Sequence, residues 1–206
     1  MTVKEIVIKA MRISLMPSVE WKTIKTEQET PRELMWNFAF PIILFSAIGR
    51  DIGLFFVVKA VLGYSLNLVI LLAFNLISWV LIPYLLILIA AYILNFGLPK
   101  LGIETDLLSV LKVVLYTFTP LFIVTFFVYL HPLLRILIPI GIYVFIAYTF
   151  YVFWYGVQEL FDITLEKKLR FIVITIVVGF LGIFVAQHIY GLLLGWVMPG
   201  MEAYVK

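Results

Sequence analysis

Long runs without any Asp, Glu, Lys or Arg divide this chain into apolar blocks separated by short polar segments. A hydrocarbon core about 30 Å thick is crossed by roughly 20 helical residues, so each run predicts one membrane-spanning helix. Strands of a membrane barrel are excluded, because the runs are far too long and lack period-two alternation. The runs are residues 34–49, 66–98, 113–131, 136–158 and 171–201.

The predicted fold is therefore all-α: a polytopic membrane protein with five transmembrane helices in a bundle. Residues 1–30 are predicted to form a short interfacial segment, and residues 31–206 the transmembrane domain. The spans are expected at about 34–55, 66–96, 108–130, 133–157 and 169–195.

The end of the first span is ambiguous, because Arg50 and Asp51 interrupt its apolar residues. Either the helix ends near Gly49 and an interfacial segment follows, or it continues to about Lys59 with a charge pair inside. We expect the first arrangement. The start is clearer, since the sequence TPRE at 30–33 has the pattern of a capping box with proline in the first turn.

The segment before the first span has the pattern of an amphipathic helix over residues 3–15. Glu5, Lys9 and Arg12 gather opposite an apolar arc, so the helix is expected to lie in the headgroup region with its cations toward anionic lipid. The apolar arc contains Val3, Ile6, Val7, Ala10, Met11, Ile13 and Leu15. A second short helix follows Pro17, and on it we expect Trp21 and Ile24 to be buried while Lys22, Lys25 and Glu29 stay solvated.

Composition supports a membrane protein and removes several chemistries. The chain has 206 residues, of which 64% are hydrophobic and 13% charged, against about 25% charged in soluble domains. With no cysteine, disulfides, thiol nucleophiles, zinc–thiolate sites and iron–sulfur clusters are excluded. No HExxH, glycine-rich phosphate loop or Ser/His arrangement is present, so we expect no enzyme, no cofactor, no metal site and no nucleic-acid partner.

The distribution of cations predicts the orientation. Eleven Lys and Arg residues flank the spans on the side of the N-terminus, and four lie on the other side. The sequence therefore predicts a cytoplasmic N-terminus and an external C-terminus.

Polar residues and prolines inside the spans are candidates for function, because burying a polar group in lipid is costly. The polar candidates are Arg50, Asp51, Asn75, Gln187 and His188. The candidates for helix kinks are Pro41, Pro83, Pro120 and Pro139. Gly191 and Gly195 form a GxxxG motif that could support a homo-oligomer.

The order of these features resembles the Yip family, the Ypt/Rab-interacting membrane proteins, in its prokaryotic branch. The first match is a P-x-x-x-W-x-x-I-x-x-E pattern at Pro17, Trp21, Ile24 and Glu27. A proline-bearing first span at 38–53 and a Tyr-x-x-x-Pro at residues 116–120 follow. The resemblance implies five spans, a cytoplasmic N-terminus and residence in a prokaryotic cytoplasmic membrane. Eukaryotic members bind Rab-type GTPases and carry a long cytosolic N-terminal region, whereas about 33 residues precede the first span here. This departure from the family pattern argues against carrying Rab binding over.

Two functions remain open from the sequence. The first is a non-catalytic membrane scaffold or accessory protein that shapes the bilayer or binds a protein partner, with Pro17, Trp21, Ile24 and Glu27 as interface candidates. The second is a transporter or channel for an ion, small molecule or lipid, built on the proline-broken helices. Transport requires Arg50, Asn75 and His188 to converge on one water-accessible cavity.

Overall fold

The computed structural model describes residues 1–62, 66–130 and 138–197, and these residues are almost entirely helical. The two N-terminal helices are α1 (Val3–Leu15) and α2 (Pro17–Thr26). The remaining elements are α3 (Pro31–Leu34), η1 (Met35–Ala39), α4 (Phe40–Leu62), α5 (Leu66–Gly97), η2 (Leu98–Leu101), α6 (Leu107–Leu130), α7 (Ile138–Leu160) and α8 (Leu165–Val197).

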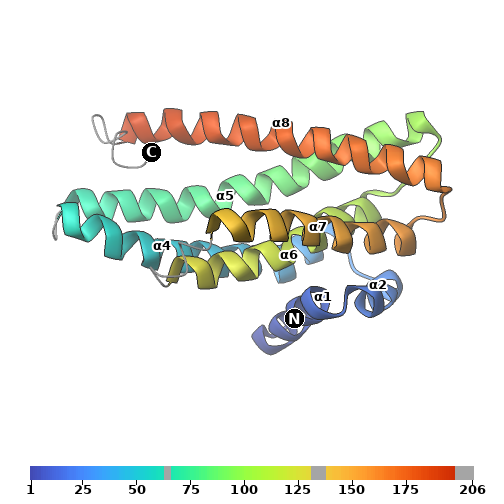
Figure 1. Ribbon diagram of the computed structural model, residues 1–206, viewed down its shortest axis with the longest axis horizontal. Coiled ribbons are helices and arrows are strands. Elements are labelled where there is room, and N and C mark those ends of the chain that lie inside the picture. Colours follow the sequence, from blue (N-terminus) through green and yellow to red (C-terminus); the bar gives the residue numbers. More distant parts are fainter. Residues whose placement is uncertain (63–65, 131–137, 198–206) are drawn as a thin grey trace.

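Four stretches of helix are long and apolar enough to cross a membrane within the described part of the chain. They are Pro31–Lys59, Asn67–Leu101, Leu107–Tyr129 and Leu165–Val197. α4, α6 and α8 run in one direction along the bundle and α5 and α7 in the other (Figure 1). The predicted all-helical membrane fold is therefore confirmed with four candidate spans.

The expectation that the first helix ends near Gly49 is wrong. α4 continues through Arg50 and Asp51 to Leu62. Both charged side chains find polar or aromatic neighbours on α5, as described below, and this removes the reason for the helix to stop at the charges. The Thr30 capping box is confirmed: the Thr30 hydroxyl accepts a hydrogen bond from the Glu33 N–H at 3.2 Å, and the Glu33 carboxylate accepts one from the Thr30 N–H at 2.8 Å.

The four proline candidates have different local structures. Pro41 directly follows the π-helical turn η1, where the Phe40 N–H bonds to the Met35 carbonyl; this wider turn lies where the proline ring would crowd the preceding carbonyl. Pro83 and Pro120 lie inside α5 and α6, which continue on both sides. α7 is described from Ile138 onward, and a kink at Pro139 stays a prediction.

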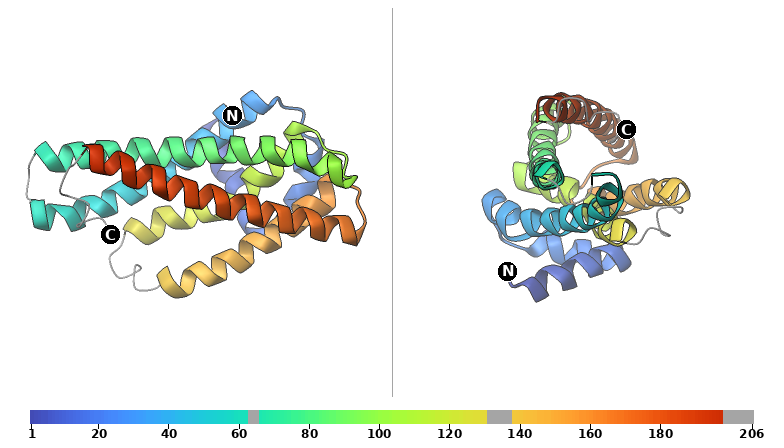
Figure 2. Two further views of the ribbon diagram at one scale, coloured as in Figure 1. Left: turned by 90° about the horizontal axis from the view of Figure 1, so that it is seen from above. Right: turned by 90° about the vertical axis from the view of Figure 1, so that its left-hand side faces the viewer.

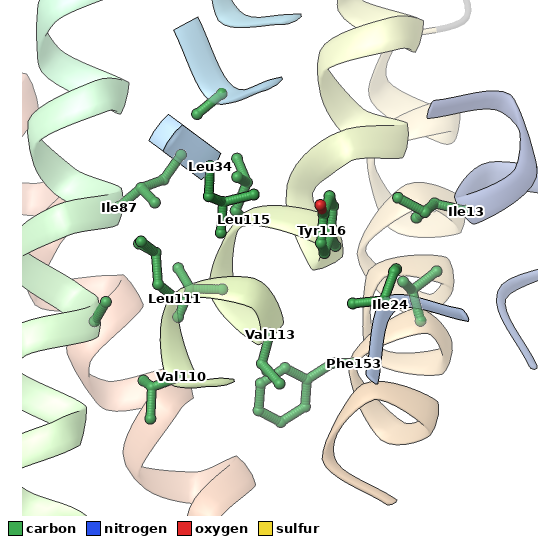
Figure 3. Packing of buried hydrophobic residues seen from close by; sticks show 14 of the residues in the cluster. Ile13, Ile24, Leu34, Ile87, Val110, Leu111, Val113, Leu115, Tyr116 and Phe153 are labelled. Carbon is green, nitrogen blue, oxygen red and sulfur yellow. The ribbon is translucent and has the colours of Figure 1, made fainter. Parts of the chain in front are cut away.

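The core is concentrated at the end of the bundle that carries η2 and the connection from α7 to α8, called here the η2 end. Figure 3 shows part of it around the first half of α6, with Leu34 and Ile87 on one side and Ile13 and Ile24 on the other. α8 lies at the periphery beside α5, on the opposite side of the bundle from α1 (Figures 1 and 2). Only 6% of its apolar window is buried, against 56% for α6, so most of α8 presents apolar side chains to the outside.

Candidate functional site

The residues of the P-x-x-x-W-x-x-I-x-x-E pattern lie at the contact between α2 and the bundle. Pro17, Trp21 and Ile24 are buried, and the Trp21 indole Nε1 donates a hydrogen bond to the Val152 carbonyl of α7 at 3.0 Å. The Trp21 ring meets the Tyr116 ring edge-on, with centroids 5.8 Å apart. The prediction that Trp21 and Ile24 are buried is confirmed, and the pattern attaches the N-terminal helices to the spans.

Gly156 of α7 provides the space for this tryptophan. A Cβ atom at this position would lie 2.6 to 2.9 Å from three carbons of the Trp21 ring, which is closer than van der Waals contact permits. The indole and the α7 backbone are therefore in direct contact, and residue 156 has to be glycine for this packing.

Lys112 of α6 holds the C-terminal end of α2. Its Nζ donates hydrogen bonds to the carbonyls of Ile24 at 2.9 Å and Glu27 at 2.8 Å. The Ile24 carbonyl also accepts the Glu27 N–H at 3.3 Å, so the lysine adds a charged donor where α2 ends. The Glu29 carboxylate lies 3.8 Å from the same Nζ. Lys112 lies near the start of the span expected at about 108–130, and a lysine at the edge of an apolar span already indicates that it needs polar partners.

The position of Lys9 shows that the predicted polar face of α1 is partly wrong. Lys9 was placed on the polar face opposite the apolar arc, but it is buried with Ile6, Ala10 and Ile13. Its Nζ forms an ion pair with Glu27 at 2.5 Å and lies 4.7 Å from the centroid of the Tyr116 ring. The carboxylate of Glu27, just after α2, and the ring face of Tyr116 on α6 together compensate for the burial of the Lys9 ammonium.

Two carboxylates of the N-terminal segment, one on α2 and one just after it, are partly removed from solvent. Burial raises the pKa of Glu20 above its ordinary value, and the nearby Arg12 and Lys9 oppose this rise. Burial likewise raises the pKa of Glu29, despite the opposing charges of Lys9 and Lys112. The prediction that Glu29 stays solvated is wrong, because one of its oxygens is buried, without a hydrogen-bond partner among the described residues.

We call α1, α2 and residues 27–29 the N-terminal platform. Lys22 and Lys25 are exposed, as predicted, and Lys4 and Arg12 are exposed as well. The outward face of α1 also carries an exposed apolar stripe consisting of Val3, Val7, Met11 and Leu15. The platform thus presents cations and apolar side chains outward while its other face is fixed to the spans.

A second polar group lies within the spans, where α4, α5, α6 and α8 meet. The Asn75 amide donates a hydrogen bond to the Asp51 carboxylate, and the Asn75 carbonyl oxygen accepts one from the Tyr190 hydroxyl at 3.2 Å. Arg50 points instead to aromatic rings, with its Cζ 3.4 Å from the centroid of Trp79. Trp79 and Tyr190 were absent from the predicted set, because nothing local in the sequence distinguishes them from other interfacial aromatics.

Gln187 and His188 do not join this group. Both are exposed on α8, and the His188 Nδ1 is 3.1 Å from the Phe184 carbonyl of the same helix. The convergence of Arg50, Asn75 and His188 that transport requires is therefore absent. A Cβ atom added at Gly191 would have no neighbour within 4 Å among the described residues, and an oligomer through Gly191 and Gly195 stays a prediction.

A cavity of about 450 Å³ opens between the connections at the η2 end, with Glu104, Asp106, Asp162 and Lys167 in its lining. The Lys167 Nζ donates a hydrogen bond to the Gly102 carbonyl at 2.5 Å. Within the described residues, no group of three or more His, Cys, Asp or Glu side chains is arranged to hold a metal ion.

The family model described as the Yip1 domain matches residues 11–186, from the middle of α1 to the second half of α8. The matched region includes the tryptophan contact, Lys112 and most of the polar group in the spans. No curated protein and no solved structure matches the chain.

Proposed function

Because this chain belongs to the Yip1 domain family, we propose that it is a non-catalytic integral membrane scaffold whose N-terminal platform binds a protein partner. The observation that carries the proposal is the attachment of the platform to α6 and α7 through Trp21 and Lys112. Helices as short as α1 and α2 are marginal in water when isolated. Fixed to the spans, they form a preorganised surface, which reduces the entropy lost when a partner binds.

The exposed cations define the partner-binding face within this proposal. Lys4 and Arg12 on α1 and Lys22 on α2 are exposed. Rim charges of this kind mainly govern the association rate and the choice of partner. The partner is accordingly proposed to carry an acidic surface and to lie in the same compartment as the platform.

The proposed topology has five spans, with the N-terminus in the cytoplasm and the C-terminus outside a prokaryotic cytoplasmic membrane. In this topology α7 crosses the membrane in addition to the four candidate spans above. Ile138–Leu160 comprises 23 residues, and Glu159 near its end is the only charged residue among them. The alternating helix directions in Figure 1 support an odd number of crossings. Because the chain has no cysteine, single cysteines at positions 2 and 206 can be labelled from each side of the membrane. Labelling of both from the same side contradicts this topology.

The partner proposal is tested by charge reversal on the platform. We expect the combined variant Lys4→Glu and Lys22→Glu to lose an acidic protein that the unchanged chain retains in mild detergent, with the melting temperature unaltered, because exposed charges contribute under about 1 kcal/mol each. Arg170→Glu, which reverses an exposed cation on α8, is the matched control and retains that protein. The proposal fails if every retained protein binds the platform variant as well as it binds the control.

A further inference from the structure

Arg50 of α4 carries hydrogen-bond donors for which the described part of the chain provides no acceptor. Its guanidinium carbon lies 3.4 Å from the centroid of the Trp79 ring on α5 and 5.2 Å from that of the Tyr129 ring on α6. The neighbouring carboxylate of Asp51 is engaged with Asn75. In the part of the chain that the structure describes, no acceptor forms a hydrogen bond or an ion pair with Arg50.

Trp79 contributes a second unused donor at the same place. Its indole Nε1 is buried and has no hydrogen-bond partner among residues 1–62, 66–130 and 138–197. An indole N–H can only donate, and a guanidinium offers five N–H donors and no acceptor. Two donor groups in contact, without an acceptor, form a site that is complementary to an anion. Leaving them unpaired within a membrane-spanning bundle is costly.

The position of Arg50 along the bundle indicates which anion is available. Tyr129 is the last but one described residue of α6 (Leu107–Leu130). From Lys112 to Tyr129 the helix rises about 26 Å, which is close to the hydrocarbon thickness of about 30 Å. Arg50 therefore lies near the membrane boundary opposite Lys112, at the depth of lipid phosphates. α4 and α5 continue beyond this level, to Leu62 and from Leu66 respectively.

We propose that Arg50 and Trp79 bind the phosphate group of a membrane phospholipid. The guanidinium edge donates to two phosphate oxygens, an arrangement that suits its planar fork, and the Trp79 Nε1 donates to one of the same oxygens. The rings of Trp79 and Tyr129 hold the guanidinium in place. This site lies far from the N-terminal platform and does not depend on the partner proposed above.

The test measures lipid binding by the delipidated full-length chain in detergent, using native mass spectrometry and thermal melting. Three probes are titrated: phosphatidylglycerol, a galactosyl diacylglycerol that lacks phosphate, and inorganic phosphate. We expect saturable binding and stabilisation by phosphatidylglycerol alone. Arg50→Gln should weaken this binding about tenfold or more, and Arg50→Lys should retain part of it. Arg170→Gln, the loss of one exposed cation at the other end of the bundle, should leave it unchanged.

Trp79→Phe keeps an aromatic ring against Arg50 but removes the second donor, so it should weaken lipid binding severalfold without the loss of a charge. It also carries the test if Arg50→Gln fails to fold. The proposal is overturned if both variants bind phosphatidylglycerol as the unchanged chain does, or if the galactolipid binds equally well. Full reproduction of the effect by inorganic phosphate would assign the site to a soluble anion and overturn the lipid.

Discussion

Replacement of Trp21 by alanine should detach the N-terminal platform from the spans. Trp21 is 1% exposed, and truncating a buried tryptophan to alanine costs about 3–5 kcal/mol. The hydrogen bond from its Nε1 to the Val152 carbonyl is lost as well and contributes about 1 kcal/mol. For a chain of this length, each kcal/mol corresponds to about 2–4 °C in melting temperature, so a cooperative loss should lower the melting temperature in detergent by about 8 °C or more.

Limited trypsinolysis shows where the loss occurs, because Arg12, Lys22 and Lys25 are exposed on the platform. If the platform opens before the spans unfold, Trp21→Ala should accelerate cleavage there even where the melting temperature changes little. Lys22→Ala removes a surface charge, and Lys25→Ala removes an exposed ion pair with Glu159; both should change the melting temperature by little, because exposed pairs contribute about 0–1 kcal/mol. Unaltered melting together with unaltered cleavage in Trp21→Ala would refute the argument that this side chain holds the platform.

Gly156→Ala tests the same contact from α7. Alanine is the better helix former by about 1 kcal/mol, so the substitution should stabilise an unconstrained helix. At this position the added methyl group would lie 2.6 Å from the Trp21 ring, and we expect destabilisation instead. Gly179→Ala on α8, where nothing lies within 4 Å, is the matched control. The double variant Trp21→Ala and Gly156→Ala should be less destabilised than the sum of the single variants.

Three further predictions concern buried polar groups. Lys112→Met removes both hydrogen bonds to the carbonyls at the end of α2 and should destabilise the platform by about 2–4 kcal/mol, measured by trypsinolysis; slower cleavage would show that the lysine is a net cost. Glu20 and Glu29 have raised pKa values in the folded chain, so their contribution to stability is greatest below pH 4.5, the ordinary value, and declines as pH rises through the raised values. Relative to the wild-type chain, the combined Glu20→Gln and Glu29→Gln variant should therefore gain stability between pH 4.5 and 7.5, and a difference that does not vary with pH contradicts the shifts. Asn75→Leu leaves Asp51 and Tyr190 without their partner and should lower the melting temperature, whereas adding Asp51→Leu should recover part of the loss in the same assay.

The sequence by itself determined the helices and the membrane class, because both depend on local properties. An uninterrupted apolar run has to satisfy its backbone hydrogen bonds internally in lipid, so it forms a helix whatever its neighbours are. The start of the first span at Thr30 was also predictable, since a capping box requires only residues within one turn. Burial of Trp21 and Ile24 followed from their spacing and from the need of a short helix for tertiary contacts.

Only the tertiary structure decided which charged residues are buried and where the first span continues. The ion pair of Lys9 with Glu27 joins α1 to the residue that follows α2, and Lys112 reaches carbonyls that lie more than 80 positions earlier in the chain. Continuation of α4 through Arg50 and Asp51 likewise depends on Asn75 and Trp79 of another helix. The free energy of placing a charge inside a bundle is set by the partners that the fold brings to it, and hydropathy along the chain carries no information about those partners.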